Sequence, residues 1–412
     1  MCPVQDVHSH TSAPPDPAWW PHQPGNFRDW LDTMRVLRPL GGASSGNQIR
    51  MFTDGDEAFE SMWAAIDSAK SRVWLETFIF EPDAVGAETI ARLRAAQQRG
   101  CEVILMYDYV GSYALKTSFL EPLRSVGAMI VPFNSIIPWR RIGPLKFRNH
   151  RKALVVDNTH AFCGGMNIGA DYAASRYGTG RFLDVHLRVV GPAVGHFAVL
   201  FEESLRESGA RPDPGRRVRR WLTSHKRWLG PEELWQLQVL GSNGFGRRRA
   251  IQRALRFALR RARSHCHITT PYFIPPPALS RALLAAAGRG VDVRIITAGD
   301  TAAPVARRAA QHVYGRFLHR GVKIYELFGR SLHAKTVSID NVFASVGSFN
   351  LDTWSHRNLE ANVIAVDPEL SKQVEEFFQS TLTSSNPVSY GDWEKRPRLR
   401  RLLDRSAYWL MH

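Results

Sequence analysis

The sequence predicts a layered α/β protein, with some α+β character, built from two copies of one unit. Each copy is expected to form a mostly parallel sheet flanked by helices. Three observations predict it: a motif occurs twice at a constant offset, apolar strands alternate with amphipathic helices, and 412 residues are enough for two domains. Alternating strands and helices are typical of parallel sheets that helices cover.

The duplication rests on two motifs, HRKALVVDN at residues 150–158 and HAKTVSIDN at residues 333–341. One offset, 333 − 150 = 183, relates the copies at the His, the Asp, the following Gly and the Asn. Four matched positions without a gap indicate an internal repeat, which determines how the rest of the chain is interpreted.

The segments around the two motifs repeat as well. Apolar runs predict strands, and a Gly after an amphipathic stretch predicts the end of a helix. The predicted elements of the first copy are Arg72–Phe80, Ala87–Arg99 ending at Gly100, and Glu102–Tyr107. Those of the second copy are His265–Ile274, Ala278–Arg289 ending at Gly290, and Asp292–Thr297. A helix should follow each motif, with core stripes at Val194, Phe197, Leu200 and Phe201 and at Val374, Phe377 and Phe378.

These patterns divide the chain into a tail (1–48), repeat 1 (49–210), a basic linker (211–240), repeat 2 (241–385) and a basic amphipathic C-terminal segment (386–412). No apolar run of 18 residues and no secretory pattern occurs, so we expect neither a transmembrane helix nor a signal peptide. Four scattered cysteines without a CxxC pair argue against a disulfide framework or a zinc site, and they fit a reducing compartment.

The charge balance points to a polyanionic partner. There are 54 Lys and Arg residues against 38 Asp and Glu residues, a formal net charge of +16. A basic surface favours nucleic acid or an anionic membrane, and charge alone does not choose between them. A generic solvated basic surface is the remaining alternative.

The motif places its polar residues in a defined pattern. Side chains two positions apart on a strand share a face, so His150 and Lys152 point the same way, as do His333 and Lys335. Each motif ends in Asp-Asn, which favours a turn, so each strand should fold back as a hairpin. The returning strands would bring polar groups to the His-Lys face, at Asn167, Ser348 and Asn350.

This set of residues suits phosphodiester chemistry. A neutral imidazole attacks phosphorus, and an imidazolium protonates the leaving oxygen. Two lysines provide charge for the phosphoryl oxygens, so we expect no metal and no other cofactor. HExxH, clustered carboxylate ligands and a Gly-rich phosphate loop are absent from the sequence, and the other histidines show no constellation. The expected catalytic residues are His150, Lys152, Asp157, His333, Lys335 and Asp340.

The pattern HxKxxxxDxxxxxxG(G/S)xN, at residues 150–167 and 333–350, resembles the signature of the phospholipase D superfamily. The resemblance covers about residues 49–385. Phrases such as GGMNIGADY at 164–172 and LHAK at 332–335 are similar to bacterial cardiolipin synthases, here of a short, membrane-peripheral type. The resemblance implies a pseudo-twofold arrangement of the repeats with one active site at their seam.

The resemblance also implies a reaction. A phosphatidyl-histidine intermediate would be resolved by phosphatidylglycerol to give cardiolipin, with phosphatidylglycerol or phosphatidylethanolamine as donor. It implies His150 as nucleophile and His333 as acid, and a downstream carboxylate that orients each histidine; the matching positions are Asp184 and Glu360. The implied partner is an anionic phospholipid membrane, and the implied location is peripheral, on the cytoplasmic side of the cell membrane.

Three alternative interpretations of the function stay open. A phospholipase-type hydrolase uses the same intermediate, and a nuclease of the same superfamily would also suit the positive charge. The cardiolipin-synthase phrasing and the Trp- and Leu-containing basic segments favour phospholipid over nucleic acid. A non-enzymatic binding protein is a third class, against which both intact motifs argue.

The two copies differ just before the motif. From the preceding Gly to the motif His there are 150 − 127 = 23 positions in the first copy and 333 − 321 = 12 in the second. The extra residues lie within 135–149, SIIPWRRIGPLKFRN, where apolar and cationic residues interleave as at a lipid headgroup boundary. This loop is the first candidate for membrane contact, unless it packs on its own domain or caps the seam. The basic segment at 396–410 is the next candidate.

Overall fold

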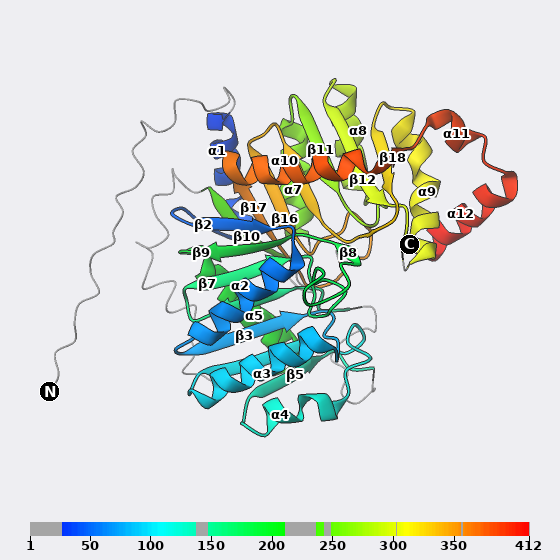
Figure 1. Cartoon of the computed structure of the whole chain (residues 1–412). Helices are drawn as coiled ribbons and strands as arrows, with labels where there is room; N and C mark the ends of the chain where they lie inside the picture. Colours follow the sequence, from blue (N-terminus) through cyan, green and yellow to red (C-terminus); the bar gives the residue numbers. More distant parts are fainter. Residues whose placement is uncertain are drawn as a thin grey trace.

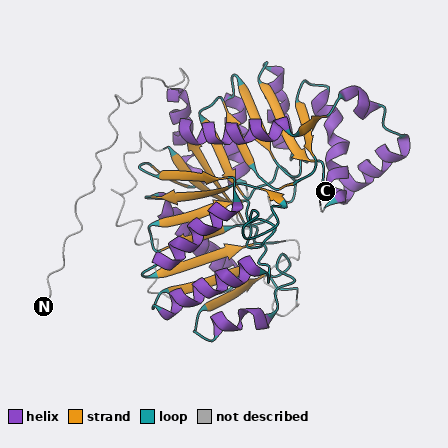
Figure 2. Cartoon of the chain, viewed as in Figure 1, coloured by secondary structure: helices purple, strands orange, loops and turns teal. Residues whose placement is uncertain are grey.

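The structure is a computed structural model that describes residues 27–136, 147–210, 236–242, 249–301, 303–355 and 357–411. Two mixed sheets, one for each repeat, make up its centre, and helices lie around them (Figures 1 and 2). The sheets meet at a core to which both contribute, with Trp74 and Val155 from one and Ala344 and Val363 from the other.

The sheet of repeat 1 has the order β2-β9-β7-β6-β3-β4-β5 in the described part of the chain. Its strands are β2 (Gln48–Phe52), β3 (Arg72–Thr77), β4 (Glu102–Asp108), β5 (Met129–Phe133), β6 (Ala153–Val156), β7 (His160–Gly164) and β9 (His186–Val190). Helices α2 (Gly55–Ser68), α3 (Ala84–Gln98) and α4 (Glu121–Arg124) form a second core with this sheet on the side away from repeat 2.

The sheet of repeat 2 has the order β1-β10-β17-β16-β15-β11-β12-β13-β18 among the described residues. Its strands are β1 (Gly42–Ser44), β10 (Leu237–Ser242), β11 (His265–Thr269), β12 (Asp292–Ala298), β13 (Lys323–Leu327), β15 (Thr336–Ile339), β16 (Phe343–Gly347), β17 (Glu360–Val366) and β18 (Ser385–Pro387). Helices α7 (Ala250–Arg261), α8 (Pro277–Gly288) and α9 (Pro304–Leu318) form its outer core.

The expectation of mostly parallel sheets is wrong. The strand–helix–strand segments do pair in parallel, β3 with β4 and β4 with β5 in repeat 1, and β11 with β12 and β12 with β13 in repeat 2. The other pairs within the two large sheets are antiparallel, because each motif strand folds back on itself as predicted: β6 pairs with β7, and β15 with β16. The turns use positive φ at Asp157 (51°), Asp340 (55°) and Asn341 (56°), a conformation that Asp and Asn tolerate.

The predicted helices and core stripes are confirmed. Helix α3 ends before Gly100, and α8 before Gly290, and both glycines have positive φ, 92° and 87°. The stripe after the first motif lies in α5 (Ala193–Glu207), and the stripe after the second lies in α10 (Pro368–Thr383). Both stripes are buried in the core that the two repeats share.

The predicted domain limits need correction at two places. The tail at 1–48 contains α1 (Phe27–Leu37), whose Trp30 is buried and stacks on Phe343 of repeat 2, with ring centroids 5.3 Å apart. Strand β1 pairs with β10, so this segment belongs to the fold of repeat 2. Residues 237–240, assigned to the linker, form part of β10, while 211–235 lie outside the described residues. The apolar patterns of β1 and β10 are short, so the predicted limits of the tail and of the linker fall at the wrong residues.

The C-terminal segment forms α11 (Tyr390–Glu394) and α12 (Arg398–Leu410), and α12 packs along α9 at one end of the molecule (Figure 1). The buried Asp404 accepts a hydrogen bond from Arg396 at 2.7 Å, which ties α12 to its own linker. None of the described helices has the length and apolar character that crossing a bilayer requires.

Candidate active site

The two motif histidines enter one site from opposite repeats. The backbone N–H of His150 donates to Leu359 O at 2.9 Å, and that of His333 donates to Leu183 O at 2.8 Å. Residue 359 belongs to repeat 2 and residue 183 to repeat 1, so each motif begins alongside a strand of the other repeat. The short strands β8 (Phe182–Leu183) and β14 (Ser331–Leu332) pair in parallel and fix the second of these contacts.

The carboxylates that orient the histidines also cross the seam. His150 Nδ1 lies 3.0 Å from Glu360 Oε2, and His333 Nδ1 lies 2.6 Å from Asp184 Oδ2. Both Asp184 and Glu360 were identified from the sequence, but the expectation of a downstream carboxylate for each histidine is wrong for His333. Its partner lies upstream, in repeat 1, because β8 and β14 bring the two segments together. Each Nδ1–H is thereby held by a carboxylate, which leaves Nε2 free for chemistry.

Each carboxylate sits against the returning strand of its own repeat, and here the copies differ. At the position of Gly165 a Cβ atom would lie 2.1 Å from Asp184 Oδ1, so only glycine leaves room for this carboxylate. The matched residue of repeat 2 is Ser348, whose hydroxyl donates to Glu360 Oε2. The shorter side chain of Asp184 lies beside a glycine, and the longer side chain of Glu360 lies beside a serine. The two carboxylates therefore reach equivalent positions at the seam.

The motif lysines lie within the same buried site. Lys152 Nζ donates to His150 O at 2.8 Å, and Lys335 Nζ donates to His333 O. Burial lowers the pKa of Lys152 well below its ordinary value and lowers that of Lys335 to about 8. A substrate phosphodiester in contact with these amines would favour their charged form.

Both imidazoles favour the neutral form in the free protein. Burial lowers the pKa of His150 well below 6.5, and the charges of Lys152 and Lys335 add to this effect. The pKa of His333 falls to about 3, again through burial first and Lys335 second, with a further contribution from Lys152. Each histidine therefore responds to the lysine of the other repeat as well as its own.

The two carboxylates are not equivalent. Burial raises the pKa of Glu360 to about 8, although Lys152 and Ser348 oppose this shift. Burial also opposes ionisation of Asp184, yet the hydrogen bond from His333 and the charge of Lys335 hold its pKa below the ordinary value. Asp184 thus provides a full negative charge to its histidine, whereas Glu360 favours the neutral form in the free site.

Aromatic rings enclose the histidines. Phe78 lies edge-on to His150 at 4.9 Å, and Tyr172 lies edge-on to His333 at 5.4 Å. The predicted support residue Asn167 accepts from the backbone N–H of Ile79 at 2.9 Å and donates to the Tyr172 hydroxyl at 2.6 Å. It therefore fixes the wall of the site through Tyr172, a contact that the sequence pattern did not indicate.

The other predicted support residue, Asn350, is 7% exposed, and its backbone N–H donates to Ser355 Oγ at 3.2 Å. Its side-chain Oδ1 is buried, and no described residue donates a hydrogen bond to it. An unsatisfied amide oxygen beside the motif remains available to a hydrogen-bond donor.

The motif aspartates do not join this site, which corrects their assignment as catalytic residues. Asp157 accepts from the backbone N–H groups of Ser71 at 2.8 Å and Arg72 at 3.0 Å, where β3 begins. Asp340 accepts from Ser264 N at 2.9 Å and His265 N at 3.2 Å, where β11 begins. Both lie at the far end of the motif strand, about 20 Å of extended chain from its histidine.

Sequence reasoning missed Arg151, between the motif His and Lys. Its side chain is fully buried, with Nη1 donating to Leu200 O at 2.6 Å and Nη2 donating to Ser242 O at 3.1 Å. Its Nε donates to Glu360 O at 3.2 Å, so one guanidinium joins α5, β10 and β17 across the seam. A buried cation between two functional residues gives no signal in the sequence pattern, because its partners are backbone carbonyls far along the chain.

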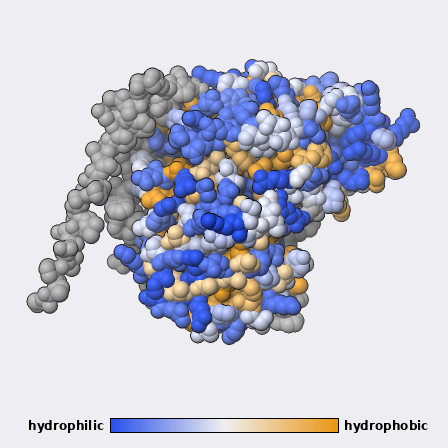
Figure 3. Space-filling model, in the orientation of Figure 1, coloured by the Kyte–Doolittle hydropathy of each residue, from blue (hydrophilic) through white to orange (hydrophobic). Residues whose placement is uncertain are grey.

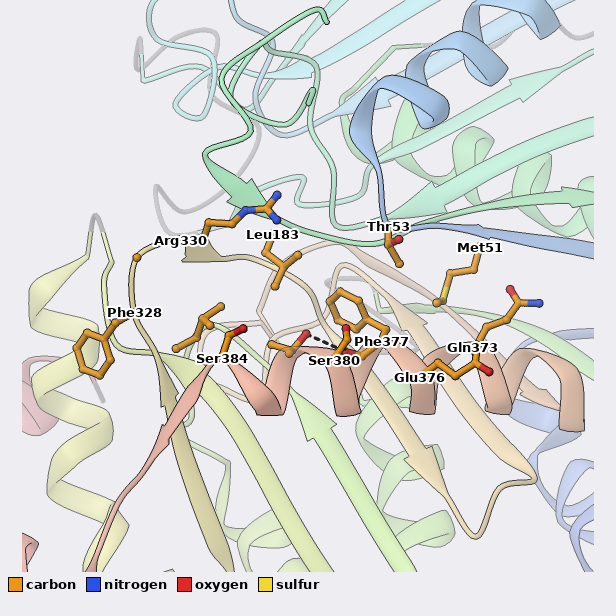
Figure 4. Close-up of a pocket in the computed structure, with 13 residues that line it drawn as sticks. Met51, Thr53, Leu183, Phe328, Arg330, Gln373, Glu376, Phe377, Ser380 and Ser384 are labelled. Carbon is orange, nitrogen blue, oxygen red and sulfur yellow. Dashed lines mark hydrogen bonds between the residues drawn. The ribbon is translucent and has the colours of Figure 1, made fainter. Parts of the chain in front are cut away.

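A cavity of about 780 Å³ borders the site without containing it. It lies at the seam between β2, the segment after β13 and α10 (Figure 4). Its lining within the described chain includes Met51, Leu183, Arg330 and Phe377, but none of the motif residues. Leu183, which lines this cavity, directly precedes Asp184, the partner of His333.

The expectation that the other histidines form no constellation is wrong for two of them. His265 and His267 of β11 lie beside Glu375 of α10, with possible ligand atoms within 4.8 Å of one another. The signal was a His-x-His pair on one strand, which places both rings on one face; its acidic partner is more than a hundred positions away. The proposed membrane loop at 135–149 falls largely outside the described residues, at 137–146.

The chain matches known proteins over both repeats. The family model described as cardiolipin synthase, PLD-like domain, matches residues 62–188 and 255–382. Cardiolipin synthase A of Pseudomonas syringae pv. syringae (strain B728a) is 28% identical over 397 residues, which covers 92% of this chain and 80% of the relative. Cardiolipin synthase of Geobacillus sp. (strain WCH70) is 29% identical, covering 88% of this chain and 71% of the relative.

The fold is also found in a solved structure. Phosphatidylserine synthase of Haemophilus influenzae Rd KW20 superposes with a TM-score of 0.67 and 15% identity, covering 93% of this chain and 98% of the other. At that identity the likeness shows the fold alone. The two family matches together span more than half of the residues and contain both His-Lys motifs. The chain therefore belongs to the family described as cardiolipin synthase, PLD-like domain, in the phospholipase D superfamily.

Proposed function

We propose that this phosphatidyltransferase forms cardiolipin, by carrying a phosphatidyl group on His150 and passing it to the hydroxyl of phosphatidylglycerol. The observation that carries the proposal is the crossed pairing of His150 with Glu360 and of His333 with Asp184. Two imidazoles oriented from opposite repeats suit a displacement at phosphorus, in which one attacks and the other serves the leaving oxygen. Membership of the family supports phospholipids as substrates.

In the first step, the Nε2 lone pair of His150 attacks the phosphorus of the donor lipid. A P–N bond forms and the P–O bond to the leaving alcohol breaks, while His333 gives its Nε2 proton to that oxygen. His333 is neutral in the free site, but an anionic phosphodiester raises its pKa, and the ionised Asp184 stabilises the imidazolium. The leaving alcohol is glycerol from phosphatidylglycerol, or ethanolamine from phosphatidylethanolamine.

In the second step, the hydroxyl of phosphatidylglycerol attacks the same phosphorus. His333, now neutral, takes the hydroxyl proton, the new P–O bond forms, and the P–N bond breaks with its electron pair returning to His150. The site is restored, so one donor and one acceptor give one cardiolipin and one small alcohol. Lys152 and Lys335 offset the charge on the phosphoryl oxygens in both steps.

Water in place of the lipid hydroxyl would turn the same intermediate into phosphatidic acid. The enclosing rings of Phe78 and Tyr172 and the burial of both lysines support exclusion of water, and therefore transfer. Nucleic acid remains the other phosphodiester that a basic protein attracts, and it provides a control substrate.

The deciding experiment incubates the full chain with mixed vesicles of phosphatidylglycerol and phosphatidylethanolamine and identifies products by mass spectrometry. We expect cardiolipin together with glycerol or ethanolamine, at the same rate after divalent metal ions have been removed with a chelator. Phosphatidic acid without cardiolipin would instead make the protein a hydrolase. Degradation of single-stranded DNA without lipid turnover would contradict the proposal altogether.

We also propose that α12 contacts an anionic membrane. Five of its apolar side chains are exposed on one face, namely Leu399 (68%), Leu402 (59%), Leu403 (45%), Trp409 (66%) and Leu410 (74%). The same helix contains arginines at 398, 400, 401 and 405. Figure 3 shows hydrophobic (orange) and hydrophilic (blue) surface side by side on the part of the molecule that the C-terminal helices form. Such a helix suits the headgroup boundary, where each cation adds about 1 kcal/mol of attraction.

The membrane proposal is tested by changing Leu402, Trp409 and Leu410 to Ser in one variant. Binding to phosphatidylglycerol vesicles in a flotation assay should fall more than tenfold, whereas cleavage of a short-chain, water-soluble phosphodiester should persist. Tyr113→Ser removes an 86% exposed aromatic side chain elsewhere and is the matched control. Unchanged vesicle binding would exclude α12 and return the role to the loop at 135–149.

A further inference from the structure

A group of three ionisable side chains lies outside the active site, between β11 and α10. His267 Nδ1 is 2.7 Å from Glu375 Oε1, and His265 Nε2 is 3.9 Å from Glu375 Oε2. The side chains are largely but not wholly covered, with exposed fractions of 7% for His267, 15% for His265 and 18% for Glu375. The group therefore combines a built interior with access from solvent.

The tautomer of His265 is set by its neighbours. Ser264 Oγ donates to Asp340 Oδ1 at 2.9 Å, so it accepts from the His265 Nδ1, which lies 3.1 Å away. With the proton on Nδ1, the lone pair of His265 Nε2 faces the Glu375 carboxylate. Both His265 Nε2 and Glu375 Oε2 are buried and have no hydrogen-bond partner among the described residues. A lone pair opposite a carboxylate is unfavourable unless a cation lies between them.

Repeat 1 shows that the fold does not require this arrangement. Arg72 and His265 occupy equivalent positions, because the backbone N–H of each donates a hydrogen bond to the motif aspartate of its own repeat. Two residues on, Trp74 stacks on Phe201 of α5, just as His267 stacks on Phe378 of α10. Glu375 precedes Phe378 by three positions.

Three positions before Phe201 lies Ala198, which is buried in the shared core. Where repeat 1 uses Arg72, Trp74 and Ala198, repeat 2 has two imidazoles and a carboxylate. Burying such groups costs stability unless something pairs with them, so their presence at one copy alone calls for a ligand.

We propose that His265, His267 and Glu375 bind one divalent ion of the zinc class, which fastens helix α10 to strand β11. Two imidazoles and one carboxylate are a common set of zinc ligands, with water in the fourth position. The hydrogen bond from His265 to Ser264, itself held by Asp340, is the outer contact that typically orients a metal-bound histidine. His267 would carry its proton on Nε2 when the ion is bound, so the ion replaces its hydrogen bond to Glu375.

The surroundings permit a cation. Arg294, on the neighbouring strand β12, interacts electrostatically with Glu375, and Asp292 holds its guanidinium group at 2.7–2.8 Å. The site lies at the start of β11, whereas the catalytic lysine Lys335 lies beyond the other end of that strand. The ion is therefore a structural clamp, and the proposal is independent of the proposed function.

The test uses the full chain, stripped with a chelator and then titrated with Zn²⁺, with Co²⁺ as a spectroscopic probe. We expect one Zn²⁺ per chain, a Co²⁺ spectrum of four-coordinate type, and a rise in Tm on adding Zn²⁺. His265→Ala and His267→Ala should each weaken Zn²⁺ binding about 100-fold or more, and Ser264→Ala about tenfold.

Two further variants keep the outcome clear. Glu375→Ala introduces the residue that repeat 1 has at this position, so it should fold and yet lose both the binding and the Zn²⁺-dependent rise in Tm. His160→Ala, a partly exposed histidine of β7, should bind Zn²⁺ as the wild type does. A wild-type protein that shows no Zn²⁺-dependent Tm, or binding that survives Glu375→Ala and His267→Ala, overturns the proposal and leaves a hydrogen-bonded trio.

Discussion

The two repeats share their hairpins but use them differently. In both, an aspartate in a positive-φ turn anchors the start of a neighbouring strand, and a histidine reaches the seam. They differ in the carboxylate, where Asp184 beside Gly165 favours the charged form and Glu360 beside Ser348 favours the neutral form. The shared features build the scaffold, and the differences assign separate roles to two otherwise equivalent histidines.

The difference supports His150 as nucleophile. An imidazole beside a neutral Glu360 has little to stabilise a positive charge, so it stays neutral with a free lone pair. An imidazole beside an ionised Asp184 can hold a proton once substrate binds, which suits an acid. Symmetry of the fold therefore need not mean symmetry of the chemistry.

The largest effect should come from removing either histidine. We expect His150→Ala and His333→Ala each to lower the rate of cardiolipin formation by about 10⁴-fold, because the first variant lacks the nucleophile and the second lacks the acid. Far-ultraviolet circular dichroism and Tm would check that the variants fold. A rate above a tenth of the wild-type value in either variant would mean that the repeats do not share one site.

The next effect separates the two carboxylates. Asp184→Asn should lower kcat by about 10²–10³-fold, since it removes the charge that stabilises the imidazolium of His333. Glu360→Gln keeps a neutral hydrogen-bond acceptor for His150 and should cost at most about tenfold. Steady-state kinetics on a short-chain substrate would measure both. Equal losses would remove the basis for giving the two histidines different roles.

The motif aspartates should affect stability instead of chemistry. Asp157→Asn and Asp340→Asn keep a residue that tolerates positive φ but weaken the acceptor for backbone N–H groups. Each should lower the free energy of unfolding by about 1–3 kcal/mol, as measured by urea denaturation. Activity per folded molecule should stay within about tenfold of wild type, and a loss as large as that of the histidine variants would restore a catalytic role.

The last prediction concerns how the stability of the protein depends on pH. The pKa of Glu360 is raised from 4.5 to about 8 on folding, so the folded state holds its proton more tightly than the unfolded state. Its contribution to stability is therefore present below pH 4.5 and is lost as pH rises towards 8. Compared with Glu360→Gln, wild-type stability should decline over this range by up to about 5 kcal/mol, the free energy that corresponds to this pKa shift. A parallel pH dependence of the two proteins would show that Glu360 is ionised throughout.

The sequence predicted the hairpins, the core stripes and the histidine and lysine positions, because strand alternation and turn chemistry are local. It misplaced α1 and β1, since Trp30 and Ala43 find their partners in repeat 2, about 200 or more positions away. It identified Asp184 and Glu360, but it did not indicate that each contacts the histidine of the other repeat. A repeat pattern contains no information about how the two copies face each other. The contact of His265 with Glu375 and the burial of Arg151 were missed for another reason, because their partners lie far away in the sequence.

The central claim is that a phosphatidyl group is carried on His150 in a site to which both repeats contribute. In the most direct measurement, the enzyme reacts with phosphatidylglycerol and the reaction is quenched before the steady state. The modified histidine is then located by mass spectrometry under alkaline conditions. We expect the phosphatidyl group on His150, with accumulation in the His333→Asn variant if the first alcohol still leaves. Modification of His333, or a protein that turns over lipid without any covalent histidine adduct, would contradict the account.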